Sequence, residues 1–284
     1  MPARRSARLP LIPPLAEPTQ EARAQADRPA QGLLPSSDKF YFTSSATAAI
    51  LPLYTTPMAT ELKNLTDWFD KVYIINCANR PDRLEAVTKH LTESGMADMS
   101  KVTIVKGVIG DYVTHPANYQ SGKGAWGCVR SMQNVAEDYL HQRDERGGLK
   151  HDNFLVLEDD VVFLDNALAD LNEFMPKVPA NWGQIYLGGQ HRQSPEKVND
   201  QVVIGCSVHR THAYAVSRAT AQAFYRHISY WPEYFFTVKH VDHQLEIAHQ
   251  RRDWPVYCPK KWICGQEAGT SNISGKNLPR QTWI

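Results

Sequence analysis

Near the middle of the chain the sequence reads Phe154-Leu155-Val156-Leu157-Glu158-Asp159-Asp160-Val161-Val162-Phe163. Four apolar residues run into three carboxylates, and a short continuous apolar run is typical of a buried strand. Acids at the end of such a strand lie where an open α/β sheet meets its ligand crevice. Like charges this close repel one another unless a cation lies among them, and carboxylate oxygens are ligands of magnesium and manganese. The stretch therefore predicts a buried strand that ends in a metal site.

Side-chain alternation along a strand separates the three acids. Glu158 and Asp160 share one face, and Asp159 points to the other. A second interpretation is an ordinary strand followed by an acidic turn or a helix N-cap. One acidic triplet does not decide between the two interpretations. The other motifs of the chain are needed to distinguish them.

Length, composition and charge indicate an ordinary globular protein and argue against several other classes. A length of 284 residues allows one large domain or two small ones, and 42% hydrophobic with 21% charged residues is ordinary for a globular protein. A net charge of +1 argues against a protein that coats nucleic acid with its whole surface. The odd number of cysteines, without zinc-site spacing, predicts reduced thiols in a cytoplasmic protein. No run of about 18 apolar residues occurs, so no membrane span is expected.

The first part of the chain differs from the rest. Residues 1–57 are rich in Pro, Ala, Arg, Gln and Ser, and such a segment cannot bury enough apolar surface to offset its ordering entropy. We expect a disordered tail there, followed by a single domain over residues 58–284. Met58 is an alternative natural start, because structured sequence follows it directly.

The folded part alternates strands with helices. A strand is expected at residues 71–76, a helix at 83–93 and a second strand at 102–108, and this rhythm favours βαβ units with a mostly parallel sheet. Further strands are expected at 184–187, 212–216 and 256–259, with the segment 205–208 preceding the second of these. Further helices are expected at 128–143, 167–175, 218–227 and from 241 onward. Residues 266–284 read as a polar tail that closes the site or the surface.

Glycines cluster before the helix expected at 128–143, in the segment Gly122-Lys123-Gly124-Ala125-Trp126-Gly127. Glycines ahead of a helix let the backbone approach a ligand closely, and helix N-terminal amides suit phosphate. The alternative is a tight loop beside a closely packed helix, and the sequence leaves both open.

Seven motifs in order resemble the family-25 glycosyltransferases, which include bacterial lipooligosaccharide galactosyltransferases and collagen galactosyltransferases. The resemblance covers about residues 71–273. The matching segments are 72–76, 79–83 (Asn-Arg-Pro-Asp-Arg), 124–131, 157–160 (Leu-Glu-Asp-Asp), 185–189 (Ile-Tyr-Leu-Gly-Gly), 211–214 and 241–245 (Val-Asp-His-Gln-Leu). Two positions depart from the family pattern: Cys77 stands where Leu is common, and Met132 where His usually follows the serine.

The resemblance implies a GT-A-type fold, an α/β domain with a mostly parallel Rossmann-like sheet flanked by helices. It also implies a UDP-sugar donor, manganese or magnesium, and inverting transfer of galactose or glucose to a hydroxyl of a glycan or lipooligosaccharide. A divalent metal would neutralise the charge growing on the nucleoside diphosphate leaving group. On this basis Asp160 and Glu158 are the expected metal ligands, and Asp159 is expected to hold the ribose or the donor sugar.

Other site residues follow from the same resemblance. Asp242 matches the family's late acidic position and is the expected general base for the acceptor hydroxyl; a helix N-cap is the alternative. Gly188 and Gly189 are assigned to the donor site. Asn76, Arg80 and Arg83 would lie at the end of the first strand and contact the nucleotide and diphosphate, although Arg83 reads equally as a solvated charge.

Two further functions remain open. Basic and aromatic residues interleave in the C-terminal part and could bind a polyanionic acceptor such as modified DNA bases. The other alternative is a non-catalytic nucleotide- or carbohydrate-binding protein with the same fold. Glu158, Asp159, Asp160 and Asp242 argue against this non-catalytic alternative, because adjacent unpaired carboxylates are typical of catalytic sites.

Overall fold

The computed structural model describes residues 61–117, 119–229, 240–271, 273 and 275–283. Its contacts divide the chain into two units, Met1–Met58 and Ala59–Ile284, and everything below concerns the second. The tail expected at residues 1–57 and the alternative start at Met58 lie outside the described residues. Among the described helices, none combines the length and hydrophobicity that crossing a bilayer requires.

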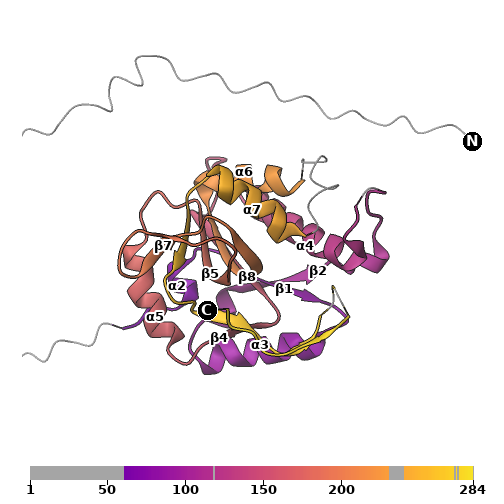
Figure 1. Cartoon of the computed structure of the whole chain (residues 1–284), viewed down its shortest axis with the longest axis horizontal. Coiled ribbons are helices and arrows are strands. Elements are labelled where there is room, and N and C mark those ends of the chain that lie inside the picture. The colour runs from indigo at the N-terminus through magenta and orange to yellow at the C-terminus, as the bar shows by residue number, and fades with distance from the viewer. Residues whose placement is uncertain (1–60, 118, 230–239, 272, 274, 284) are drawn as a thin grey trace, which may run out of the picture. The chain divides into compact units, whose positions relative to one another are not determined.

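An eight-stranded sheet in the order β2-β1-β3-β8-β5-β9-β7-β6 forms the centre of this unit (Figure 1). The pairs β1–β2, β1–β3 and β5–β9 are parallel, whereas β8 is antiparallel to both β3 and β5. Strand β7 is antiparallel to both β9 and β6, so six strands share one direction and only β7 and β8 of this sheet run the opposite way. The bounds are β1 (Val72–Cys77), β2 (Val102–Gly107), β3 (Asn153–Glu158), β5 (Gln184–His191), β6 (Glu196–Lys197), β7 (Val202–Ile204), β8 (Val208–Ser217) and β9 (Val256–Pro259).

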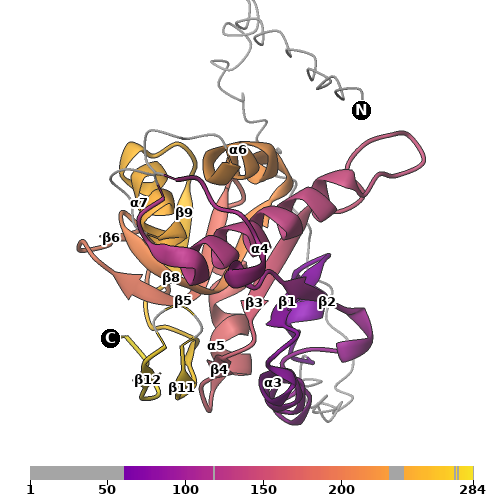
Figure 2. The same cartoon turned by 90° about the vertical axis from the view of Figure 1, so that its right-hand side faces the viewer.

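Helices cover both faces of the sheet. Figure 2 shows α4 (Gly122–His141), α6 (Arg218–Ser229) and α7 (Val241–Arg251) on one side, and α3 (Pro81–Glu93) and α5 (Ala167–Phe174) on the other. Two separate groups of buried apolar side chains fill the space between sheet and helices, one on each face. The remaining helical segments are α2 (Leu65–Trp68), η1 (Met99–Lys101), η2 (Gly110–Tyr112) and η3 (Met175–Lys177). The predicted α/β class, with a mostly parallel central sheet flanked by helices, is confirmed.

The apolar run before the three acids forms β3, as predicted. Phe154, Leu155, Val156 and Leu157 are each fully buried. Phe154 and Val156 pack into the core beneath α4 and α6, while Leu155 and Leu157 pack into the opposite core. A strand covered on both faces needs apolar residues at every position, which is why the run does not alternate with polar residues.

Residues 205–208 lie mostly in the turn between β7 and β8, and β8 begins only at Val208. Residues 192–207, all described, hold the short antiparallel pair β6–β7 and no helix. A parallel return needs a crossover of a dozen or more residues, usually a helix, so β8 pairs antiparallel to β5.

Helix α4 begins earlier than predicted, at Gly122 instead of residue 128. The predicted glycine loop is therefore the first two turns of the helix. A Cβ added at Gly127 would lie 2.4 Å from the carbonyl oxygen of Val108. Close packing of α4 against the segment that follows β2 thus requires glycine at this position, which supports the packing interpretation of the cluster.

The C-terminal residues return to the end of β3. Strand β10 (Cys264–Gln266) pairs antiparallel with β4 (Val161–Phe163), which directly follows the three acids. The amide of Glu267 donates to the carbonyl of Asp160 at 2.7 Å. Strands β11 (Gly269–Thr270) and β12 (Asn277–Leu278) follow and pair antiparallel with each other as a hairpin. This segment closes the site, which was one of the two roles expected for the tail.

Candidate active site

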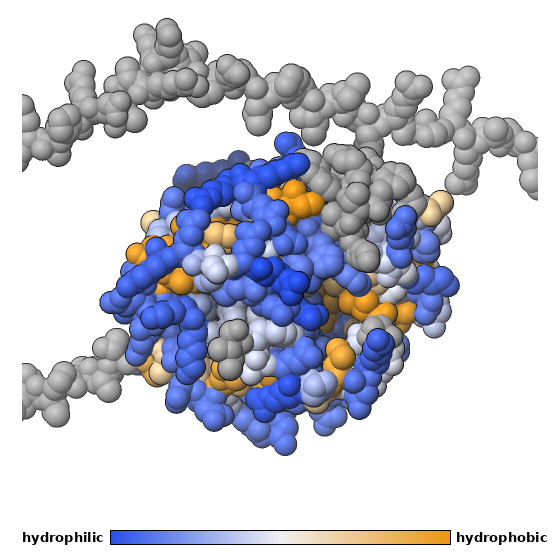
Figure 3. Space-filling view, in the orientation of Figure 1, coloured by the Kyte–Doolittle hydropathy of each residue, from blue (hydrophilic) through white to orange (hydrophobic). Residues whose placement is uncertain are grey.

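A cavity of about 310 Å³ lies at the carboxyl ends of β1 and β3, which is where open α/β sheets bind ligands. Its walls also come from the segment after β2, the start of α4, the start of β8 and the C-terminal residues. In the view of Figure 3, the surface is mostly hydrophilic and its apolar side chains form small, separate groups. The lining includes Arg83, Glu158, Asp159, Asp160, Arg210, Thr211 and Tyr214.

Glu158, the last residue of β3, has a pKa well above that of a free carboxyl group. Thr211 Oγ1 donates to Glu158 Oε1 at 2.9 Å. Burial, and next the negative charges of Asp160, Asp159 and Asp242, raise the pKa of Glu158 to about 8. Removal from water and nearby like charges both disfavour the ionised form. The carboxylate therefore lacks a cationic partner strong enough to offset these two effects.

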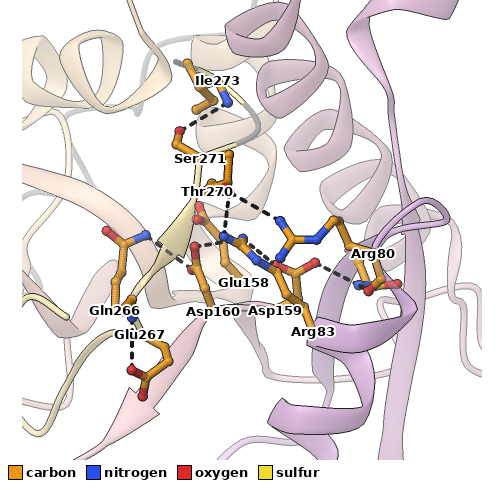
Figure 4. A network of polar contacts seen from close by, with 12 residues as sticks. Arg80, Arg83, Glu158, Asp159, Asp160, Gln266, Glu267, Thr270, Ser271 and Ile273 are labelled. Carbon is orange, nitrogen blue, oxygen red and sulfur yellow. Dashed lines mark hydrogen bonds and ion pairs between the residues drawn. The ribbon is translucent and has the colours of Figure 1, made fainter. Parts of the chain in front are cut away.

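Asp159 and Asp160 share one cation, the guanidinium of Arg83. Arg83 Nη1 lies 3.1 Å from Asp159 Oδ1 and 3.0 Å from Asp160 Oδ2. Gln266 Nε2 donates to Asp160 Oδ1 at 3.3 Å. Figure 4 shows Arg83 and Gln266 approaching the acids from different elements. Burial is the main cause that raises the pKa of Asp160, and the charge of Arg83 opposes it.

The prediction for Arg83 needs refinement. It was expected either to contact diphosphate or to be a solvated charge, and its side chain is only 13% exposed. Its Nη2 donates to the carbonyl of Thr270 at 3.0 Å, so the guanidinium joins the acids to the C-terminal hairpin. The solvated interpretation is wrong, and the positive charge is engaged with protein carboxylates.

Asn76 and Arg80 belong to the same network. Asn76 Nδ2 donates to Asp159 Oδ2 at 2.7 Å and to the carbonyl of Arg80 at 2.8 Å. Arg80 forms an ion pair with Asp82 at 2.9 Å and donates to the Thr270 carbonyl at 3.2 Å. These hydrogen bonds connect the end of β1 and the start of α3 to the acids. Asn76 and Arg80 therefore lie near Asp159, in the region where the sequence predicts the nucleotide site.

Asp242 lies in the first turn of α7, whose N-cap is His240. The N-cap interpretation of Asp242 is therefore wrong. Asp242 Oδ2 accepts from the amide of Arg210 at 3.3 Å, and Oδ1 accepts from the amide of His243 at 2.9 Å. Arg210 lines the cavity, so this contact holds the Asp242 carboxylate beside the cavity. Its role as a base stays a prediction.

Gly188 and Gly189 lie within β5 and do not belong to the cavity lining. A Cβ added at Gly188 would lie 2.4 Å from His212 Nε2 and 2.5 Å from the carbonyl oxygen of Cys264. A close approach of β5 to β8 and β10 explains the glycine at this position. The structure does not bring these two residues to the acids.

Several residues around the acids were not anticipated from the sequence. Thr211 binds Glu158, Gln266 binds Asp160, and Thr270 supplies the carbonyl for both arginines. Arg210 has a positive φ of 73°, which is uncommon for a residue other than glycine. Thr211 lies in the matching segment 211–214, but its contact with Glu158 has no local signal, because the two residues are far apart in the chain.

We expect Glu158→Gln to flatten the pH dependence of stability. The pKa of Glu158 rises from 4.5 to about 8 on folding, so the folded state binds the proton more tightly than the unfolded state. This contribution to stability is complete below about pH 4.5 and is lost as the pH rises through about 8. In metal-free buffer, the melting temperature of the wild type should fall across this window, and that of Glu158→Gln should fall less.

The matched control for this experiment is Glu145→Gln, at an exposed loop position. It should keep the wild-type slope of melting temperature against pH. Equal slopes for Glu158→Gln and Glu145→Gln would contradict the assignment of the raised pKa to Glu158.

The fold and the cavity together define an α/β protein with a carboxylate-lined ligand site at the ends of its parallel strands. No family model matches the chain. The chain is 28% identical over 177 residues to the procollagen lysyl hydroxylase and glycosyltransferase of Acanthamoeba polyphaga mimivirus. The match takes in 54% of this chain and 19% of that protein, so the chain spans about a fifth of the length of this relative.

Solved structures with related folds are more distant. A glycosyltransferase involved in the glycosylation of the major capsid of PBCV-1 has a TM-score of 0.35 at 10% identity, covering 63% of this chain and 74% of that chain. A putative glucose-1-phosphate thymidylyltransferase from Bacillus anthracis has a TM-score of 0.34 at 13% identity, covering 66% and 88%. Likeness at this level carries no argument about function.

Proposed function

We propose that the domain is a GT-A-type glycosyltransferase similar to family 25. It transfers galactose or glucose from a UDP-sugar to a hydroxyl of a glycan acceptor, with inversion and with a divalent metal. The observation that carries the proposal is the group of Glu158, Asp159 and Asp160 at the end of β3, inside a cavity and with two raised pKa values. The partial sequence match to a viral protein named as a glycosyltransferase supports the same class.

The donor set fits a hard divalent cation. Glu158 and Asp160 offer carboxylate oxygens, the ligands that manganese and magnesium prefer. Arg83 is shared by Asp159 and Asp160, and burial together with the neighbouring acids raises the pKa of Glu158. A bound metal would neutralise the negative charge that develops on the leaving UDP. Glu158 and Asp160 are the residues that would hold it.

The other residues have positioning and proton-transfer roles in this proposal. Asn76 fixes Asp159 by its hydrogen bond to Oδ2, and Asp159 then accepts from a hydroxyl of the ribose or the donor sugar. Arg83 bridges Asp159 and Asp160 and holds both carboxylates in place. Asp242, held by the amide of Arg210, accepts the proton of the acceptor hydroxyl as it attacks the anomeric carbon.

A thermal-shift screen tests the donor class. The protein is heated with UDP, GDP or CMP, each with and without manganese. A ligand at a hundred times its dissociation constant stabilises the folded state by about 2.7 kcal/mol. We expect a manganese-dependent shift with UDP and smaller shifts with GDP and CMP. If UDP stabilised the protein equally with and without manganese, a binding protein would be favoured over a metal-dependent transferase. The absence of a thermal shift with any nucleotide would contradict the proposal.

A further inference from the structure

A second group of potential ligands lies where the start of β8 meets the first turn of α7. His209 belongs to the start of β8, and Asp242 and His243 to the first turn of α7. Each of the three offers one ligand atom, and these atoms all lie within 4.8 Å of one another. All three residues are half-buried, so they are partly shielded from water and still open to a small ion.

The two imidazoles converge at this position. The ring centroids of His209 and His243 are 4.5 Å apart with an interplanar angle of 43°. His240 adds a third ring, 5.6 Å from that of His243. An imidazole nitrogen is a common metal ligand in proteins, so converging rings at one position favour a metal site.

Glu246 holds His209 in the way that an outer carboxylate holds a metal-ligating histidine. Its Oε2 lies 2.8 Å from His209 Nε2. Its other oxygen accepts from Ser207 Oγ and from Gln250 Nε2, the latter at 3.2 Å. A carboxylate bound to one ring nitrogen fixes the tautomer and the orientation of the ring for metal binding through the other nitrogen. This leaves Nδ1 of His209 to act as the ligand.

We propose that His209, Asp242 and His243 bind a zinc ion, at a site separate from the one formed by Glu158 and Asp160. Two imidazole nitrogens and one carboxylate form a donor set typical of zinc with one position left open. The other site offers only oxygen atoms, which suit manganese or magnesium. The two sites therefore select different ions by the chemistry of their ligands.

The zinc site has a regulatory consequence that rests on the proposed function. Asp242 is the proposed base, and a carboxylate bound to zinc is no longer available to accept the proton of the acceptor. Zinc should therefore inhibit transfer without displacing UDP. Since His209 and His243 have no part in the proposed chemistry, their removal should relieve the inhibition while leaving activity in zinc-free buffer intact.

The test measures ion binding to the full chain without any sugar donor. Zinc is titrated calorimetrically, and cobalt replaces it as a probe whose visible absorption reports its coordination. We expect one zinc ion per chain, and binding at least tenfold weaker in His209→Ala and in His243→Ala. Glu246→Gln should weaken zinc binding by about 10- to 100-fold, the usual effect of losing an outer carboxylate.

Two control variants make the result specific. His141→Ala removes an exposed histidine at the end of α4 and should bind zinc as the wild type does. Asp160→Asn removes a ligand of the other site and should also leave zinc binding unchanged. Equal affinity in His243→Ala and His141→Ala would overturn the proposal, as would a wild type whose added cobalt gives only the spectrum of the hydrated ion.

The same variants separate this inference from the proposed function. Zinc binding that depends on His209 and His243 in a protein without transferase activity would support the site and remove only its inhibitory role. If the protein is active, zinc should inhibit the wild type and His141→Ala at least tenfold more strongly than His243→Ala. Equal inhibition of His243→Ala and the wild type would contradict the regulatory role.

Discussion

Asp160→Asn should lower the rate of sugar transfer by about 100- to 1,000-fold. Stabilisation of charge by a bound metal contributes several kcal/mol to the transition state, and each 1.4 kcal/mol is a factor of ten in rate. Asparagine keeps the size of the side chain and an oxygen that accepts from Gln266 or Arg83, but it loses the negative charge. The measurement is the initial rate of UDP release with acceptor, at several manganese concentrations.

Asp165→Asn is the matched control for this variant. Asp165 is exposed and follows β4 only a few residues after the three acids, so it receives the same chemical change outside the cavity. It should retain the wild-type rate. Retention of activity by Asp160→Asn, or an equal loss in both variants, would contradict the role of Asp160.

Asp242→Asn should lower kcat by about 10²- to 10⁴-fold, the usual contribution of a general base. Because Asp242 contacts the backbone of Arg210 and not the acids of β3, the manganese-dependent binding of UDP should be unchanged. Rates are measured in zinc-free buffer, and UDP binding is measured by thermal shift on the same preparations.

Asp253→Asn provides the comparison, since Asp253 is an exposed acid just beyond α7. Its kcat should equal that of the wild type. If Asp242→Asn lost UDP binding and kept its kcat with saturating donor, Asp242 would belong to the donor site and not to the proton transfer.

The sequence was sufficient to predict β3 and the position of its acids. Residues buried on both faces must all be apolar, so Phe154 to Leu157 carry their own signal, and the acids mark the end of the strand. The direction of β8 had no such signal. The connection after β5, residues 192–207, contains no crossover helix and only the short strands β6 and β7, and these short strands lack a clear sequence pattern.

The partners of the acids could not be predicted from local patterns. Arg83 lies 76 residues before Asp159, and only the packing of α3 against β1 and β4 brings its guanidinium to the acids. The carbonyl of Thr270 acts through the backbone, where the side chain gives no information. Gly188 illustrates the opposite error, because a glycine needed for close packing reads in the sequence like a glycine that admits a ligand.

Calorimetric titration of UDP into the wild type and into Asp160→Asn, each with and without manganese, tests the central claim most directly. The proposed site predicts that manganese strengthens UDP binding to the wild type and has little effect on UDP binding to Asp160→Asn. Folding of the variant is checked by its melting temperature without ligand. UDP binding by the wild type that is absent, or that is the same with and without manganese, would contradict a metal-dependent nucleotide-sugar site at the end of β3.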